Sequence, residues 1–148
     1  MSVPLPALLL GVAGLLPFVA GALAAHGMMP GISNPITGLL ILQTYGAAIL
    51  AFMGGCLWGF AAEARRRDWQ PYVYSVIPAL WAASATLFPG IPGFGAPPAL
   101  ATLASGFVVL LAVDLLFRGW GLGPRWWLSL RLPLSAGVLV CLGAGLAA

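Results

Sequence analysis

Charged side chains are scarce in this chain of 148 residues, which has six arginines, no lysine, three acidic residues and one histidine. Charged residues make up 6% of the sequence and hydrophobic residues 61%. A soluble domain of this size needs far more polar surface to face water, so the composition excludes an ordinary soluble fold. The net charge of +3 comes from these few arginines. It gives no indication of nucleic-acid binding.

Reactive groups are equally few. Cys56 and Cys141 lie in apolar segments without a CxxC spacing, so the sequence predicts neither a disulfide framework nor a zinc site. There is no HExxH motif and no phosphate-binding loop. The segment His26–Met29 (HGMM) offers soft ligands that suit Cu(I), but no second cluster supports it, and we interpret it as loop packing. We therefore expect no enzymatic activity, no cofactor and no metal.

Long uncharged runs dominate the chain instead. A helix needs about 20 apolar residues to cross a hydrocarbon core of about 30 Å, and five segments qualify. The lengths of these segments exclude transmembrane strands. The first segment lacks the basic region of a signal peptide, so we interpret it as a retained span. We predict an all-α integral membrane protein, a five-transmembrane-helix bundle forming one domain over residues 1–148, with spans near 4–25, 35–62, 72–88, 97–117 and 132–147.

The arginines predict the orientation of this bundle. They fall in two clusters, after the second and the fourth spans, and an odd-even count puts both clusters on one face. Because arginine marks cytoplasmic loops, the N-terminus is predicted to be cytoplasmic and the C-terminus periplasmic, in a bacterial cytoplasmic (inner) membrane. Basic and aromatic residues crowd the same face. We predict that they anchor the protein at lipid headgroups, anionic ones included: Arg65, Arg66, Arg67, Trp69, Trp120, Trp126 and Trp127.

One carboxylate, Asp114, lies inside the apolar run Val109–Phe117 (VLLAVDLLF). Intramembrane carboxylates are costly and usually functional. Asp114 is only about 5 Å from the cytoplasmic end of its span, however, and Arg118 follows at the i+4 spacing that brings helix side chains together. Arg125 and Arg131 belong to the same face, in a segment (GPRWWLSLR) that we interpret as a loop in which Pro124 can open a short helix. We predict a structural ion-pair cluster of these four residues. The alternative, a proton or ion relay, needs further ionisable groups across the membrane.

Two further patterns lie within the spans. Ala47, Ala51, Gly55 and Gly59, with Gly54 alongside, recur at four-residue spacing and predict a helix-packing groove, for a helix of this chain or of another protein. Polar side chains fall in the outer halves of three spans. They line a small polar cavity open to the outside, or they form hydrogen bonds between helices: Gln43, Tyr45, Ser84, Thr86, Thr102 and Ser105.

Four features in this order, GLLPFVAGAL, YGAAILAFMGGCLWG, Asp114 and PRWWLSLRLPLS, resemble an uncharacterised five-span family. The family includes mitochondrial transmembrane protein 69 and many proteobacterial inner-membrane proteins. The resemblance implies the fold, a membrane location and a role for Asp114, Arg125, Trp126 and Arg131, but no activity. The family commonly has histidine before the tryptophan of its second-span motif, where this chain has Leu57. That departure favours a structural role.

Scarce chemistry, short loops and the small-residue groove lead to one preferred hypothesis. We expect a non-enzymatic integral membrane protein, an accessory subunit or assembly factor of a larger energy-transducing inner-membrane complex. Its partners would be membrane proteins of that complex and membrane lipids. The alternative is a small transporter, channel or lipophilic-ligand-binding protein that uses the outer polar cavity and Asp114.

Overall fold

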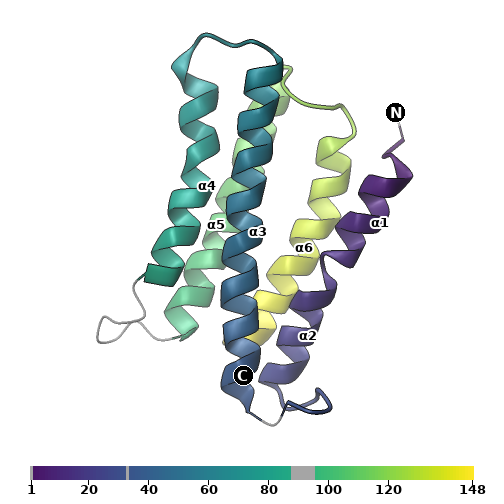
Figure 1. The fold of residues 1–148 in the computed structure, drawn as a ribbon, viewed down its shortest axis with the longest axis vertical. Coiled ribbons are helices and arrows are strands. Elements are labelled where there is room, and N and C mark those ends of the chain that lie inside the picture. Colours follow the sequence, from purple (N-terminus) through teal and green to yellow (C-terminus); the bar gives the residue numbers. More distant parts are fainter. Residues whose placement is uncertain (1, 33, 88–95) are drawn as a thin grey trace.

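The structure is a computed structural model that describes residues 2–32, 34–87 and 96–148. Within these ranges the chain is all-α, and successive rods run up and down the long axis of the bundle (Figure 1). This confirms the predicted helical membrane fold. The helices are α1 (Leu5–Ala13), α2 (Leu16–Ala25), α3 (Pro35–Glu63), α4 (Trp69–Leu87), α5 (Ala96–Gly119) and α6 (Trp127–Leu146).

Among the described residues, four helical segments are long and apolar enough to cross a membrane: α1 with α2, then α3, α5 and α6. The described α4 falls below this level of hydropathy, because its 19 residues include tyrosine, tryptophan, serine and two prolines. It nevertheless packs lengthwise against α3 and α5 (Figure 1). At 1.5 Å per residue it is about 28 Å long, close to the thickness of the hydrocarbon core. We therefore count α4 as a membrane crossing as well, which brings the crossings in the described residues to five. Residue 88, the predicted end of this span, lies outside the described residues.

The last helix begins earlier than the sequence predicted. The backbone N–H of Trp127 donates to the carbonyl of Pro124 at 3.0 Å, and α6 runs from Trp127 rather than from residue 132. Most of the WWLSLR segment is therefore helical and not a loop. The interfacial aromatic and basic residues hid this extension, because they lower the hydropathy of the first turns. As a consequence Arg131 lies on a helix that faces α5.

The first crossing is bent between α1 and α2. Pro17 has no N–H to donate and its ring crowds the carbonyl four residues earlier, which favours a break or kink in the helix here. The chain responds with a tight turn in which the N–H of Leu15 donates to the carbonyl of Val12 at 3.0 Å. Below the bend α2 packs on α3 and α6, whereas α1 contacts chiefly α6 and has no fully buried residue. The bend opens a space between α1 and α3.

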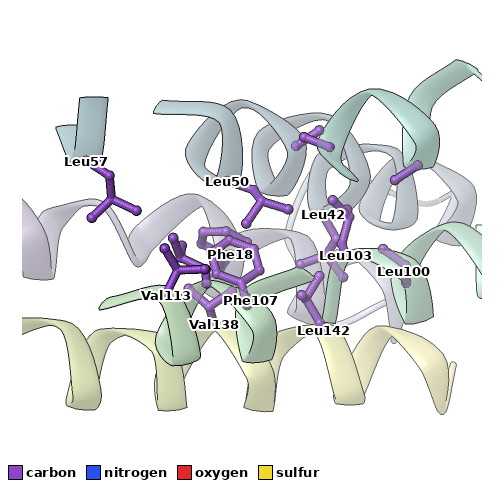
Figure 2. Packing of buried hydrophobic residues seen from close by; sticks show 14 of the residues in the cluster. Phe18, Leu42, Leu50, Leu57, Leu100, Leu103, Phe107, Val113, Val138 and Leu142 are labelled. Carbon is purple, nitrogen blue, oxygen red and sulfur yellow. The ribbon is translucent and has the colours of Figure 1, made fainter. Parts of the chain in front are cut away.

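Large side chains fill the centre of the bundle. Figure 2 shows Phe18 of α2 and Phe107 of α5 together at the middle, between Leu50 of α3 and Val138 of α6. The two phenyl rings meet edge to face, with centroids 6.3 Å apart. Lipid tails are as apolar as these side chains, so van der Waals packing rather than the hydrophobic effect holds the helices together.

Close packing between backbones relies on glycine. A Cβ atom added at Gly38 of α3 would lie 2.6 Å from the carbonyl oxygen of Gly21 on α2. A Cβ at Gly54 would lie 2.6 Å from the carbonyl oxygen of Ser75 on α4. Real Cβ atoms do not approach this closely, so any larger residue would separate these helices.

Candidate functional site

Asp114 is buried in the interface between α5 and α6, where both of its carboxylate oxygens are bonded. Its Oδ2 accepts a hydrogen bond from Nε of Arg131 at 3.2 Å and forms a salt bridge with it. Its Oδ1 accepts a hydrogen bond from the indole Nε1 of Trp127 at 2.8 Å. We call Asp114, Trp127 and Arg131 the buried clasp.

The early start of α6 makes this clasp geometrically possible. Trp127 and Arg131 are four residues apart on one helix, a spacing that places both side chains on the same face. The ring of Trp127 also packs edge to face on Phe60 of α3, with centroids 4.9 Å apart. The clasp therefore connects three helices. A charged pair in this setting is tolerable only because its groups are hydrogen-bonded to one another.

Arg118 and Arg125 do not join the clasp. Both are exposed, and within the described residues neither forms a salt bridge with Asp114. Arg118 has the predicted i+4 spacing, but the carboxylate of Asp114 faces α6 instead of running along its own helix. Both arginines border a recess of about 410 Å³ beside Asp114 and Trp127. The predicted four-residue cluster is thus one buried pair, Asp114 with Arg131, and two arginines at the rim of the recess.

Glycines shape the turn that closes this recess. Gly121 and Gly123 have φ values of +71° and +80°, a left-handed conformation that residues with a Cβ rarely adopt. A Cβ atom at Gly123 would also lie 2.9 Å from the ring of Phe60. The tight turn connects the end of α5 at Gly119 to the start of α6 at Trp127. It places Trp127 within hydrogen-bonding distance of Asp114.

A second cavity, of about 340 Å³, is also lined by Trp127. It occupies the space left by the bend in the first crossing, and its wall is almost entirely apolar. We call it the bend cavity. Its lining comes from α1 and α2 (Ala7, Leu10, Gly11, Gly14, Leu15, Phe18), α3 (Ile49, Phe52, Met53, Cys56) and the start of α6 (Trp126, Trp127, Leu130, Arg131, Leu134, Val138).

Two buried polar groups near the clasp lack partners. Within the described residues, Nη2 of Arg131 and the hydroxyl of Ser135 have no hydrogen-bond partner. Ser135 lies one turn after Arg131 on α6 and is fully buried. Buried donors without acceptors are rare in native proteins and call for an explanation. Sequence reasoning missed Ser135, although its i+4 spacing from Arg131 was a signal.

The five residues of the predicted groove do not share one face. Ala47 and Gly54 are buried inside the bundle, Ala51 is half-buried, and Gly55 and Gly59 are exposed. At about 100° per residue, each step of four residues turns the position by about 40° around the helix. Three steps from Ala47 to Gly59 therefore carry it about a third of the way around α3. The four-residue spacing therefore grouped residues of the buried face of α3 with residues of its exposed face.

The predicted outer polar cavity is not formed as a common space by its six residues. Most hydroxyls bond to a carbonyl of their own helix: Ser84 to Trp81, Thr102 to Pro98, Ser105 to Thr102, and Thr86 to Ala82 and Ala83. Gln43 does bridge helices, since its side-chain N–H donates to the carbonyl of Ala85 at 2.8 Å. Tyr45 packs against Phe18. Ser84 and Thr102 border the same surface depression.

Some of the predicted interfacial anchors are exposed, and others are partly buried in the bundle. Trp69 is highly exposed, as an anchor should be, and Arg65, Arg66 and Arg67 lie in the turn before it. Arg66 forms a salt bridge with Asp68 at 3.0 Å. Trp120 is half-buried against Phe117 and Tyr74, whereas Trp126 and Trp127 line the bend cavity.

At the opposite end, the ring nitrogen Nε2 of His26 lies 3.1 Å from the carbonyl oxygen of Ala144. This contact joins the end of the first crossing to the end of α6. It accords with the interpretation of the HGMM segment as loop packing.

A family model described as "Protein of unknown function (DUF3429)" matches residues 3–147, nearly the whole chain. The chain belongs to this family. Transmembrane protein 69 of Xenopus tropicalis is 42% identical over 88 residues, which are 57% of this chain and 34% of that protein. Transmembrane protein 69 of Mus musculus is 32% identical over 133 residues, which are 87% of this chain and 50% of that protein. No solved structure matches.

These matches confirm the family resemblance seen in the sequence, and they make the protein a membrane protein of the transmembrane protein 69 family. The chain spans about half or less of the length of the curated relatives it matches. The matched region includes the whole buried clasp and the bend cavity. The name of these relatives describes location in a membrane and gives no activity.

Proposed function

We propose that this protein is a non-enzymatic accessory or assembly subunit of a larger membrane complex. In a bacterium its membrane would be the cytoplasmic (inner) membrane, and its complex one that transduces energy. The observation that carries the proposal is an exposed stripe on α3, formed by Ala48, Phe52, Gly55 and Gly59. We call it the open stripe.

The open stripe has the same construction as the packed faces of this helix. Gly38 and Gly54 of α3 hold α2 and α4 at backbone contact. A Cβ atom added at Gly55 or Gly59 would meet nothing within 4 Å in the described part of the chain. Small residues let helices approach closely in lipid, where close packing is the main source of association. The open stripe therefore suits a helix of a partner protein.

The polar chemistry of the bundle supports a structural role. Asp114 is fully engaged by Arg131 and Trp127. Most hydroxyls of the predicted polar set bond to carbonyls of their own helices, and Gln43 links two helices. These bonds stabilise the bundle, and both oxygens of the Asp114 carboxylate take part in them.

Lipid contact is a further part of the proposal. Arg118 and Arg125 border the recess at the α5–α6 turn, and both side chains are exposed. Guanidinium groups at this depth attract anionic headgroups. An anionic lipid would thus bind at the rim of the recess, outside the buried clasp.

The decisive experiment compares partner binding by matched variants. The tagged protein is extracted from its native membrane with a lipid-preserving polymer and sized by native mass spectrometry. We expect an assembly larger than the single chain, lost in Gly55→Leu/Gly59→Leu. Ala112→Leu, at an exposed position on α5, is the control and should retain it. A single chain in every sample, or equal loss in the control, would refute the proposal.

The transporter or channel alternative has weaker support, because the predicted outer polar residues mostly bond within their own helices. The same alternative included a protein that binds a lipophilic ligand, and one specific observation favours that role. That observation is the bend cavity beside Arg131.

A further inference from the structure

We infer that the bend cavity binds a neutral lipophile that carries a carbonyl oxygen, held by hydrogen bonds from the guanidinium of Arg131. This site does not depend on the partner-binding role, although the open stripe and the bend cavity use neighbouring residues of the same stretch of α3. Only Phe52 belongs to both.

The size and wall of the cavity favour a small apolar body. Its volume of about 340 Å³ falls at the lower end of the range of roughly 300–1,000 Å³ found for small-molecule sites. Such sites are mostly apolar with a few placed polar groups. Phe18, Phe52 and Trp126 supply aromatic surface, and Arg131 is the one charged residue of the lining.

The guanidinium of Arg131 has donors to spare. It carries five N–H groups in a fixed fork, and Nε is the nitrogen that bonds to Asp114. Nη2 is buried and has no acceptor among the described residues. Leaving a buried donor unpaired is unfavourable, more so when the group is charged. Arg131 lines the bend cavity, and a small shift of its side chain would let a ligand oxygen there accept a hydrogen bond from Nη2.

Charge balance selects a neutral ligand over an anion. The negative charge of Asp114 already compensates that of Arg131 at 3.2 Å, and Trp127 bonds the second carboxylate oxygen. A carboxylate or phosphate in the cavity would add an uncompensated charge within the membrane, which is costly. A ketone or ester carbonyl accepts the same hydrogen bonds without that charge. The two sources are a quinone-like ring ketone and the ester carbonyl of a lipid.

Access is available from the lipid side. Leu10 of α1 and Phe52 of α3 both line the cavity, and they are 74% and 62% exposed. The cavity therefore communicates with the surface of the bundle between α1 and α3. A lipophile can enter laterally from the hydrocarbon phase without crossing water.

The test measures binding of four probes to the purified full chain in nanodiscs by quenching of tryptophan fluorescence. The probes are a decyl-substituted benzoquinone, a brominated short-chain diacylglycerol, a brominated decanoate and a brominated decane. We expect the quinone, the diacylglycerol or both to bind at least about tenfold more tightly than the decanoate and the decane. Binding by one carbonyl probe alone identifies the source, and binding by both assigns the shared chemistry.

Variants locate the binding. Ala7→Phe fills the cavity from α1 and should weaken the carbonyl probes at least about tenfold, whereas Ala112→Phe on the outside of α5 should not. Asp114→Leu/Arg131→Met removes the donor together with its partner, so that no charge is left unpaired, and should also weaken them. Its thermal unfolding checks that it folds. Absence of binding by both carbonyl probes, equal binding of decane or decanoate, or unchanged binding in Ala7→Phe overturns the inference.

Discussion

Asp114 and Arg131 are 17 residues apart and joined at 3.2 Å across the α5–α6 interface, with side chains that are 0% and 5% exposed. The sequence between them forms a turn whose glycines adopt left-handed conformations. This pair fixes the rotation of α6 against α5. The same rotation places Arg131 at the wall of the bend cavity.

Breaking the pair on one side should destabilise the fold. Asp114→Asn or Arg131→Gln leaves a buried group without its charged partner, and we expect each to lower the free energy of unfolding by about 3–5 kcal/mol. Asp114→Leu/Arg131→Met leaves no unpaired charge but removes the acceptor of the Trp127 N–H, so we expect a loss of about 1–3 kcal/mol, smaller than that of either single change. Thermal unfolding in detergent measures all three.

The control for this series is Arg118→Gln. Arg118 is exposed and forms no salt bridge with Asp114 within the described residues, so its loss should change stability by less than about 0.5 kcal/mol. If the Arg118 variant is as unstable as the Arg131 variant, the carboxylate bonds along its own helix in the membrane, and the clasp is wrong.

Trp127 should contribute through its N–H as well as through its ring. Trp127→Phe keeps an aromatic ring near Phe60 but removes the donor to Oδ1 of Asp114. A hydrogen bond to a charged group contributes about 1.5–3 kcal/mol, and we expect a loss in that range. Trp126→Phe, whose indole N–H has no hydrogen bond to Asp114, is the matched control. Equal unfolding temperatures for the two variants would contradict this role.

Composition and run length were enough to predict the helical membrane fold, because about 20 apolar residues in a row have few other uses. The start of α6 could not be predicted in this way, since interfacial residues such as Trp127 and Arg131 resemble a loop by hydropathy. Reading them as a loop hid the fact that they share a helix face. Their i+4 spacing was the signal that pairs both with Asp114.

The sequence also could not show which of the nearby arginines binds Asp114. The i+4 rule favoured Arg118, but it applies to neighbours on one helix and ignores the rotation of the helix against the next. That rotation depends on packing of large side chains such as Phe107 and Val138. Likewise, the i+4 stripe from Ala47 to Gly59 looked like one surface because the drift of about 40° per step was neglected.

Adjacent glycines on α3 should respond oppositely to the same substitution. Gly54→Ala places a methyl group 2.6 Å from the carbonyl oxygen of Ser75, so α4 must move, at a cost of about 1–3 kcal/mol. Gly55→Ala meets nothing within 4 Å in the described structure and gains helix propensity of up to about 1 kcal/mol. Thermal unfolding of the two variants in the same detergent gives the comparison. Equal losses would mean that α3 is rotated from its position here.

The predicted orientation can be tested at the two termini, which lie at opposite ends of the bundle (Figure 1). In a Cys56→Ala/Cys141→Ala background, Ser2→Cys and Ala148→Cys are each treated with a membrane-impermeant maleimide in bacterial spheroplasts. Because arginine-rich turns stay cytoplasmic, we expect labelling at position 148 only. Permeabilised cells, in which both react, are the control. Labelling of position 2 alone would reverse the orientation. Labelling of both in intact spheroplasts would mean an even number of crossings, and α4, the helix of lowest hydropathy, would then not span the membrane.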